Sequence, residues 1–328
     1  MRLASFRFDD RERVGFEVGP SALAALDVAW PAAGLGEPPA TLLELIEAGD
    51  RGRRDLDRCR AHALGHPDEV PHIPVEAVHW RPPVRRPSKV VGVALNNAAF
   101  APAAHRYFEK PAFFLKPPSC LIGHGDPIEV GADYGLTHPE AELACVIGRR
   151  LRRASEDTCR EAVFGYAIID DVTCPGMKDR DSIHLKIPAG MPGERRIDWR
   201  ELRSPEDGDV YLTYHARSKG ADTFGPMGPW LVTADEVPDP HALGVRVWMG
   251  DDLVTEDHTG SLSFRVPEVL AHLAASMTLE PGDVVHFGTA VNPVKYGLRQ
   301  ADLSHLDGPV AIEIDGLGRL ENPVVRIA

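Results

Sequence analysis

Residues 137–148 read Thr-His-Pro-Glu-Ala-Glu-Leu-Ala-Cys-Val-Ile-Gly and predict a buried strand that carries two carboxylates. Every residue from Leu143 to Ile147 is apolar, which is typical of a strand inside a core. Because a strand repeats every two residues, the side chains of Glu140 and Glu142 leave the same face. Two like charges this close repel each other unless a cation lies between them. The pair therefore indicates either a site for a divalent metal ion or the wet face of a half-exposed strand.

A third carboxylate follows the apolar run at 165–169, where the sequence continues with Asp170 and Asp171. Three hard oxygen donors suit magnesium, manganese or calcium. No group of Cys and His residues at zinc spacing competes with them in the sequence. A carboxylate site also leaves positions open for water or for a chelating substrate.

Composition and charge limit the class of protein and its partners. Hydrophobic residues make up 43% and charged residues 26% of the 328 residues, as in soluble globular proteins. The net charge of -13 argues against a nucleic acid or an anionic membrane as partner. The five cysteines are odd in number and lack Cys-x-x-Cys spacing, which indicates reduced thiols. With no signal-like or membrane-spanning apolar run, we expect a cytoplasmic protein.

Proline content divides the chain. Six prolines between positions 67 and 87 interrupt every periodicity, so residues 67–88 are expected to form an extended linker. The linker would join a small N-terminal α+β domain, residues 1–66, to a larger domain, residues 89–328. A capping box at Thr41 to Glu44 and a hairpin formed by 2–8 and 14–18 are predicted in the small domain.

The larger domain is expected to be mostly β. Helices are predicted at 155–165 and at about 267–277, and the other segments are short strands separated by Gly and Pro turns. There is no β-α-β alternation and no glycine-rich phosphate loop, which excludes a doubly wound nucleotide-binding sheet. The pattern predicts an α+β, mostly β fold, with mixed sheets rolled into a sandwich.

Six motifs occur in one order between residue 89 and the C-terminus, and together they resemble the fumarylacetoacetate hydrolase family. They are K-P-P-S (116–119), H-P-E-A-E-L-A-C-V-I-G (138–148), G-Y-A-I-I-D-D-V-T (165–173), K-G-A-D-T-F-G-P-M-G-P-W (219–230), L-E-P-G-D-V-V-H-F-G-T (279–289) and G-L-G-R-L-E-N-P-V (316–324). The resemblance implies that family's C-terminal β fold and a homodimer. It also implies that Glu140, Glu142 and Asp171 bind Mg²⁺ or Mn²⁺, with Ca²⁺ as a further option.

The resemblance implies roles for four more residues. Lys219 would point at the metal-bound substrate, where a fixed cation stabilises a developing enolate or oxyanion. By sequence alone, the default for this lysine is a surface position. Lys116, Ser119 and Thr289 lie in segments that border the family's pocket, and we expect them to bind substrate; ordinary strand-end turns are the alternative.

One motif of the hydrolytic family members is altered. They carry L-N-Y-x-x-H-x-x-E, whose His and Glu activate the attacking water, but residues 95–103 place Phe100 and Ala103 at those positions. Neither side chain can move a proton, and Phe100 is expected to contact substrate instead. His105 and Glu109, four residues apart, could form a shifted dyad or belong to a polar surface turn.

A second departure lies after Asp171. The usual T-A-R-D reads Thr-Cys-Pro-Gly at 173–176, which removes an arginine that could meet an anionic substrate. Residues 177–215, rich in charge, Gly and Pro, are expected to be an inserted lid. Arg180, His184 or Lys186 could reach the pocket from it.

The expected function is that of a metal-dependent enzyme acting on a small molecule, a 2-oxo acid or 1,3-dicarbonyl compound. A metal-chelated enolate would serve C-C bond hydrolysis, decarboxylation or tautomerisation. Of these reactions, only hydrolysis needs a base to activate water, and the His and Glu that serve as this base are replaced by Phe100 and Ala103. The alternative is a catalytically reduced family member that acts as a binding or scaffold protein.

Overall fold

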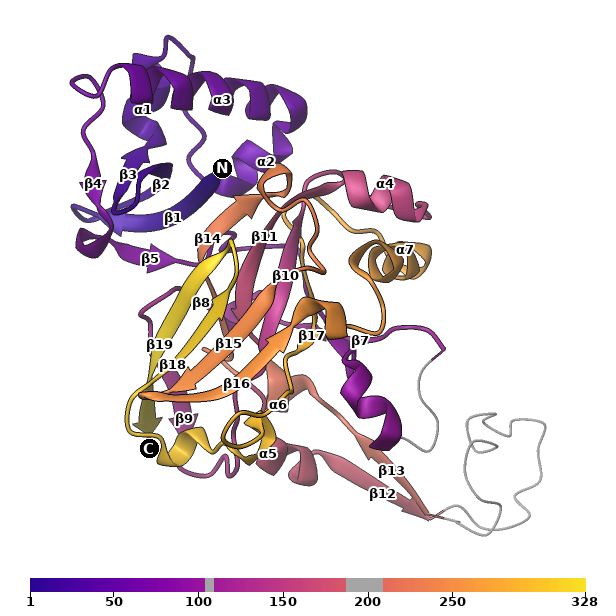
Figure 1. The fold of residues 1–328 in the computed structure, drawn as a ribbon. Helices are drawn as coiled ribbons and strands as arrows, with labels where there is room; N and C mark the ends of the chain where they lie inside the picture. The colour runs from indigo at the N-terminus through magenta and orange to yellow at the C-terminus, as the bar shows by residue number, and fades with distance from the viewer. Residues whose placement is uncertain (104–108, 187–208) are drawn as a thin grey trace.

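The computed structural model describes residues 1–103, 109–186 and 209–328. Figure 1 shows a β-rich body, an N-terminal part with its own helices at one end, and a hairpin that projects at the other. The strands form sheets of twelve, five and two members in the described chain. None of the helices in these ranges is long and apolar enough to cross a membrane.

The twelve-stranded sheet runs through the whole molecule. Its main order is β4-β3-β2-β1-β14-β11-β10-β17-β6-β7, while β5 pairs with β1 and β8 pairs with β14. The strands are β1 (Arg2–Phe8), β2 (Arg11–Gly19), β3 (Ala22–Ala25), β4 (Ile73–Pro74), β5 (His79–Arg81), β6 (Val90–Ala94), β7 (Ala112–Lys116), β8 (Leu121–Ile122), β10 (Ala141–Ile147), β11 (Val163–Asp170), β14 (Gly225–Thr233) and β17 (Val284–Thr289).

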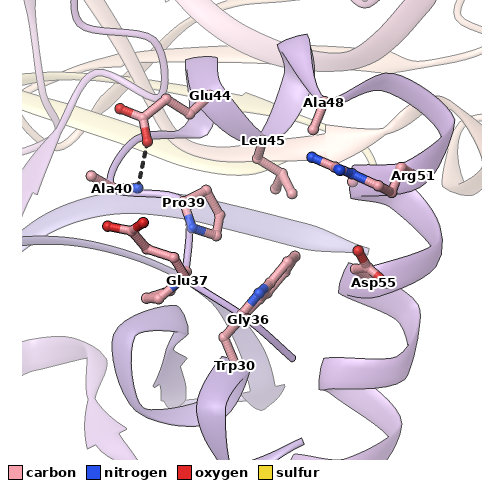
Figure 2. A pocket seen from close by; sticks show the side chains of 12 residues that line it. Trp30, Gly36, Glu37, Pro39, Ala40, Glu44, Leu45, Ala48, Arg51 and Asp55 are labelled. Atoms are coloured by element: carbon pink, nitrogen blue, oxygen red, sulfur yellow. Dashed lines mark hydrogen bonds between the residues drawn. The ribbon is translucent and has the colours of Figure 1, made fainter. Parts of the chain in front are cut away.

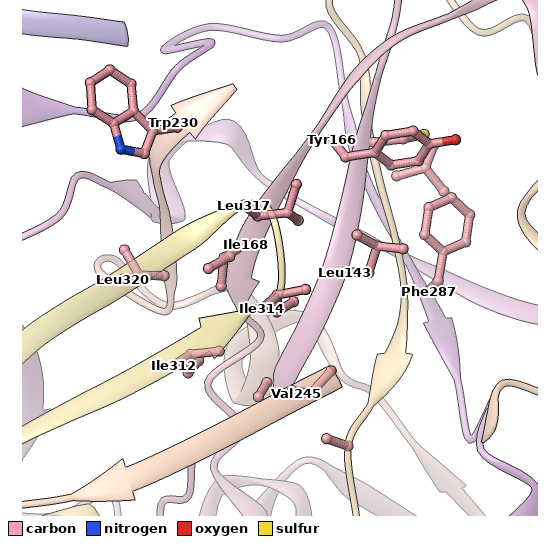
Figure 3. Close-up of a cluster of buried hydrophobic side chains, with 14 of the residues drawn as sticks. Leu143, Tyr166, Ile168, Trp230, Val245, Phe287, Ile312, Ile314, Leu317 and Leu320 are labelled. Atoms are coloured by element: carbon pink, nitrogen blue, oxygen red, sulfur yellow. The ribbon is translucent and has the colours of Figure 1, made fainter. Parts of the chain in front are cut away.

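The five-stranded sheet packs against the large one. It comprises β16 (Asp252–His258), β15 (Gly244–Met249), β18 (Pro309–Ile314), β19 (Gly318–Ile327) and β9 (Ile128–Gly131), in that order. Figure 3 shows Leu143 and Ile168 of the large sheet facing Ile312 and Ile314 of the smaller one. The predicted fold class, mostly β with packed mixed sheets, is confirmed.

The other face of the large sheet is covered by the N-terminal helices. Ala144 and Val146 of β10 share a buried cluster with Leu45 and Leu56, while Leu143 and the other odd-numbered residues of β10 belong to the core between the sheets. Burial on both faces explains why the sequence of β10 is an unbroken apolar run.

Helices of the described chain fall into three groups. The N-terminal group is α1 (Leu26–Ala32), α2 (Leu42–Glu47) and α3 (Gly49–Gly65), and α4 (Glu156–Glu161) contacts α7 (Val266–Ser276). The third group, α5 (Pro175–Arg180) and α6 (Ala216–Gly220), lies beside the hairpin of β12 (Ser182–Lys186) and β13 (Asp209–Thr213). Short 3-10 helices include η1 (Val75–Ala77), η2 (Ala98–Ala103), η3 (Pro118–Cys120), η5 (Ala234–Glu236), η6 (Thr259–Ser261), η7 (Leu298–Gln300) and η8 (Leu303–His305).

Two local predictions about the N-terminal part are confirmed, and one about the larger domain needs correction. The hairpin β1–β2 forms, and the Thr41 side chain accepts a hydrogen bond from the backbone of Glu44 at the start of α2. The helix predicted at 155–165 ends at Glu161, because Val163 already pairs with Ile147 as part of β11.

The N-terminal part is joined to the larger one by strand pairing. Leu3 of β1 pairs with Leu231 of β14, and Phe6 pairs with Trp80 of β5. The segment 67–88 holds β4, η1 and β5, so it contains structured elements as well as prolines. The domain boundaries, and the assignment of 177–215 as an inserted lid, remain predictions.

Candidate metal and substrate site

The candidate site lies where three central strands meet at one end. Glu142, near the start of β10, pairs with Ile169 near the end of β11 and with Thr289 at the end of β17. Antiparallel pairing therefore brings Glu142, and Glu140 just before β10, close to Asp170 at the end of β11 and to Asp171 just after it. The backbone N–H of Asp171 donates to the carbonyl of Glu140, 2.9 Å away, which fixes this arrangement.

Asp171 is fully buried between two lysines. Lys116 Nζ donates to Oδ1, and Lys219 Nζ donates to Oδ2 over 2.5 Å. Lys219 also donates to Glu140 Oε2 at 3.0 Å and to Thr173 Oγ1 at 2.6 Å. Burial opposes the charged form of Asp171, but the two ammonium groups outweigh it and hold its pKa well below the usual range.

Lys219 stays charged because carboxylates surround it. Burial lowers the pKa of an ammonium group, yet the Asp171 and Glu140 carboxylates outweigh that effect and raise the pKa of Lys219 above its usual value. The Nζ atom also lies 4.9 Å from the centroid of the Phe114 ring. The lysine is thus a fixed cation at the carboxylate cluster and is only 8% exposed.

Within the described chain, Glu142 makes no ion pair with a lysine and is bound by nitrogen atoms of β17. Its Oε2 accepts from the backbone N–H of Gly288 at 2.6 Å and lies 2.7 Å from His286 Nδ1. Burial raises the pKa of Glu142, partly offset by His286. A further positive charge at this position would therefore favour its ionised form.

The donors at the cluster fit a divalent cation. Glu142, Asp171 and His286 each offer one ligand atom, and these atoms lie within 4.8 Å of one another. Glu140 is linked to this cluster by an ion pair with Lys219. Carboxylate oxygens are ligands that suit both Mg²⁺ and Mn²⁺.

Asp170 differs from its neighbour Asp171. Its Oδ1 accepts from the backbone N–H of Glu140 at 2.8 Å, while Oδ2 is buried with no hydrogen-bond partner in the described chain. Burial raises the pKa of Asp170 to about 7. Of the two aspartates, Asp171 is the one held among charged groups.

A pocket of about 610 Å³ opens beside Glu140. Phe100 and Thr289, both expected to contact substrate, line it together with His138 and Tyr296. His138 is 3% exposed, and burial lowers its pKa, which favours the neutral imidazole. Its Nδ1 lies 3.9 Å from Glu140 Oε1.

Several expected contacts with the pocket are not found. Lys116 was expected to bind substrate, but its Nζ is buried against Asp171 and the carbonyl of Phe224, 2.7 Å away. Ser119 is exposed in η3 and Glu109 is exposed next to β7, and neither lines the pocket. Arg180 binds Asp133 at the surface.

Other predicted residues cannot be placed. His105 lies outside the described residues, and so do the side chains of His184 and Lys186. The shifted dyad of His105 and Glu109 therefore remains a prediction.

Sequence reasoning missed two histidines. His138 stands inside the quoted 137–148 stretch, two residues before Glu140, and that position on a strand was a usable signal. His286 is a single polar residue in the apolar run 284–287. A buried polar side chain needs a hydrogen-bond partner. The position of His286 in a predicted buried strand therefore indicated that it binds another polar group.

Comparison with known proteins identifies the family of the chain. The sequence profile described as Fumarylacetoacetate (FAA) hydrolase C-terminal matches residues 89–325. The chain is 30% identical over 246 residues to "Oxaloacetate tautomerase fahd2, mitochondrial" from Xenopus laevis, covering 74% of this chain and 67% of the relative.

Solved structures of similar proteins cover the full chain. The maleylpyruvate hydrolase from Sphingobium sp. SYK-6, in complex with manganese (II) ion and pyruvate, matches with a TM-score of 0.70 and 28% identity, covering 100% of both chains. The fumarylacetoacetate hydrolase from Exiguobacterium antarcticum matches with a TM-score of 0.71 and 26% identity over 100% of both chains. From the extent of the profile match and from these relatives, we conclude that the chain belongs to the fumarylacetoacetate hydrolase family.

Proposed function

We propose that this protein is a divalent-metal-dependent enzyme that acts on a small 2-oxo acid or 1,3-dicarbonyl compound, and that it favours tautomerisation or decarboxylation over C-C hydrolysis. The observation that carries the proposal is the buried cluster of Glu142, Asp171 and Lys219 next to the pocket beside Glu140. It is supported by the manganese and pyruvate in one similar structure and by the tautomerase among the relatives.

Glu140, Glu142 and Asp171 would hold the cation. When bound, it would supply a Lewis acid for the carbonyl and carboxylate oxygens of the substrate. The protein groups keep these carboxylates in place: Lys116 and Lys219 bind Asp171, and the Gly288 N–H binds Glu142.

Lys219 would contribute a second positive charge. Its Nζ lies 3.0 Å from Glu140 Oε2, and Glu140 lines the pocket. A fixed ammonium group in a buried site stabilises negative charge that develops on a substrate oxygen, and it does so without reorganising at the moment of reaction. Removal of one such donor typically costs about 10²- to 10³-fold in kcat.

Phe100 is the reason to favour reactions without an activated water. It occupies the position of the catalytic histidine in hydrolytic relatives and lines the pocket, where its ring cannot accept a proton. General-base catalysis is worth about 10²- to 10⁴-fold. Water attack should be slowed by this factor. Decarboxylation releases CO₂ and depends chiefly on the cation and Lys219, while tautomerisation would also exchange the carbon-bound proton of the substrate with solvent water.

The test compares reactions in one preparation of the full chain. Oxaloacetate tautomerisation, oxaloacetate decarboxylation and acylpyruvate hydrolysis would be measured with Mn²⁺, with Mg²⁺ and with a chelator, for the parent and for Lys219→Met. We expect metal-dependent turnover of oxaloacetate, slower hydrolysis, and a fall of about 10²- to 10³-fold in kcat for the variant. Absence of metal-dependent turnover on all three would contradict the proposal, and hydrolysis as fast as the other reactions would contradict its preference.

A further inference from the structure

His286 lies in the middle of β17 and is completely buried. Its Nδ1 is 2.7 Å from Glu142 Oε2, the oxygen that also accepts the backbone N–H of Gly288 at 2.6 Å. Two nitrogens from one strand thus meet a single carboxylate oxygen. Donation from both would stop the carboxylate from rotating and would leave its other oxygen for a cation.

The ring of His286 is held on two further sides. A Cβ atom at Gly92 of β6 would lie 2.5 Å from its Cε1 and 2.7 Å from its Nε2, so the ring fills the space that this glycine leaves. The Phe114 ring packs edge-on, with 5.8 Å between centroids and an interplanar angle of 74°. The imidazole therefore cannot turn Nε2 toward the carboxylates without moving its neighbours.

The surroundings of the two ring nitrogens favour a proton on Nδ1. Nε2 is buried and has no hydrogen-bond partner in the described chain. If Nδ1 bound a metal, the proton of a neutral ring would sit on Nε2 and leave a buried donor unpaired. With the proton on Nδ1, the ring donates to Glu142 and only an acceptor is left unpaired, which proteins tolerate more often.

We infer that His286 is a positioning residue of the metal site: its Nδ1–H donates to Glu142 Oε2 and, with the Gly288 N–H, fixes the carboxylate that binds the cation. This inference rests on the proposed function, since it presumes that Glu142 is a metal ligand. The ring acts through Glu142 and does not itself coordinate the ion. Hydrogen-bond partners of metal ligands typically contribute about 10- to 100-fold to metal affinity.

Two variants separate donation from mere space filling. His286→Leu keeps an apolar side chain in the space but has no donor, whereas the amide N–H of His286→Asn can replace Nδ1–H. Calorimetric titration of the metal-stripped full chain with Mn²⁺ should show binding about 10- to 100-fold weaker for the Leu variant and close to parental for the Asn variant. Thermal melting and near-UV circular dichroism would show that each variant is folded.

Each outcome decides a different claim. If the parent does not bind Mn²⁺, the proposed function and this inference both fail. If the parent binds and the folded Leu variant binds equally well, only the inference fails. If the Asn and Leu variants are equally weak, the ring nitrogen is itself the ligand and the inference is overturned.

A measurement on the parent does not depend on the Leu variant folding. Proton-nitrogen correlation spectra of ¹⁵N-histidine-labelled protein, with the His286 signals assigned by their loss in the Asn variant, report which ring nitrogen carries hydrogen. We expect hydrogen on Nδ1 before and after addition of diamagnetic Mg²⁺. Loss of that hydrogen on Mg²⁺ binding would overturn the inference.

Discussion

Among the cavities of the described chain, two have nearly equal volumes but differ in the charges beside them. The cavity beside Glu140 measures about 610 Å³, and the N-terminal cavity in Figure 2 measures about 600 Å³. Glu140 lines the first and is paired with Lys219, which is buried and bound to Asp171. In the second, Glu37 and Arg51 are exposed to solvent. Cavity volume therefore does not identify the site, whereas converging buried charges do.

The two cavities also differ in how the chain builds them. The N-terminal cavity is lined by residues from one stretch, 30–55, and a hydrogen bond from Ala40 N–H to Glu44 links two of its loop and helix residues. The charged cluster combines Lys116, Glu142, Asp171 and Lys219 from separate parts of the sequence. Bringing these groups together requires the whole central sheet, which accounts for the buried, ordered surroundings of the site.

The largest expected effect on stability comes from removing Lys116. Lys116→Met would deprive the buried Asp171 of one partner and the Phe224 carbonyl of its donor, which should cost about 3 to 5 kcal/mol of unfolding free energy. The matched change in the N-terminal cavity, Arg51→Met, should stay within about 0.5 kcal/mol. Urea denaturation of the metal-stripped proteins measures both, and equal midpoints for the two variants would break the comparison.

A smaller effect on stability is expected from an ion pair that joins the N-terminal helices to the larger part of the chain. Arg53 of α3 donates to Asp235 in η5 over 2.8 Å. Burial opposes the charged form of Asp235, but hydrogen bonds from Arg53 and Thr233 and the charge of Arg53 outweigh it and lower its pKa to about 2. Because the folded-state pKa is depressed, the pair stabilises the fold above the unfolded value of 3.8 and loses this contribution as the pH falls toward about 2.

Asp235→Asn should therefore lower the free energy of unfolding only slightly, and only at pH values where Asp235 is ionised. The pair is half exposed, so screening by solvent limits the loss to about 0.2 to 1 kcal/mol at neutral pH. Denaturation of parent and variant at several pH values should show this difference shrinking below about pH 4. A difference that grows on acidification would contradict the assigned direction.

The local parts of the fold could be predicted from the sequence. The apolar run 143–147 predicted a buried strand, and it lies in β10; the hairpin β1–β2 and the cap at Thr41 were also predicted correctly. These features depend on neighbours within a few residues. The pairing of β1 with β14 was not predicted, because it joins segments that lie far apart in the sequence and leaves no local pattern.

The site could likewise be predicted only as far as local sequence patterns and the family motifs reach. The spacing of Glu140 and Glu142 predicted that they share a face, and the family resemblance grouped them with Asp171. The partner of Lys116 could not be read from K-P-P-S, because Asp171 is 55 residues away. His286 was missed because a single polar residue in a strand has no periodicity, and its meaning depends on Glu142 across the sheet.

One measurement tests the metal site most directly, with a Glu→Gln change at that site and a matched one in the N-terminal cavity. Calorimetric titration with Mn²⁺ would be done on the metal-stripped parent, on Glu142→Gln and on Glu37→Gln. Loss of a ligand carboxylate should weaken binding in Glu142→Gln by at least about 100-fold, the largest loss typical of removing a hydrogen-bond partner of a metal ligand. Glu37→Gln should bind like the parent. Parental affinity in a folded Glu142→Gln variant, or an equal loss in Glu37→Gln, would contradict the assignment of the site.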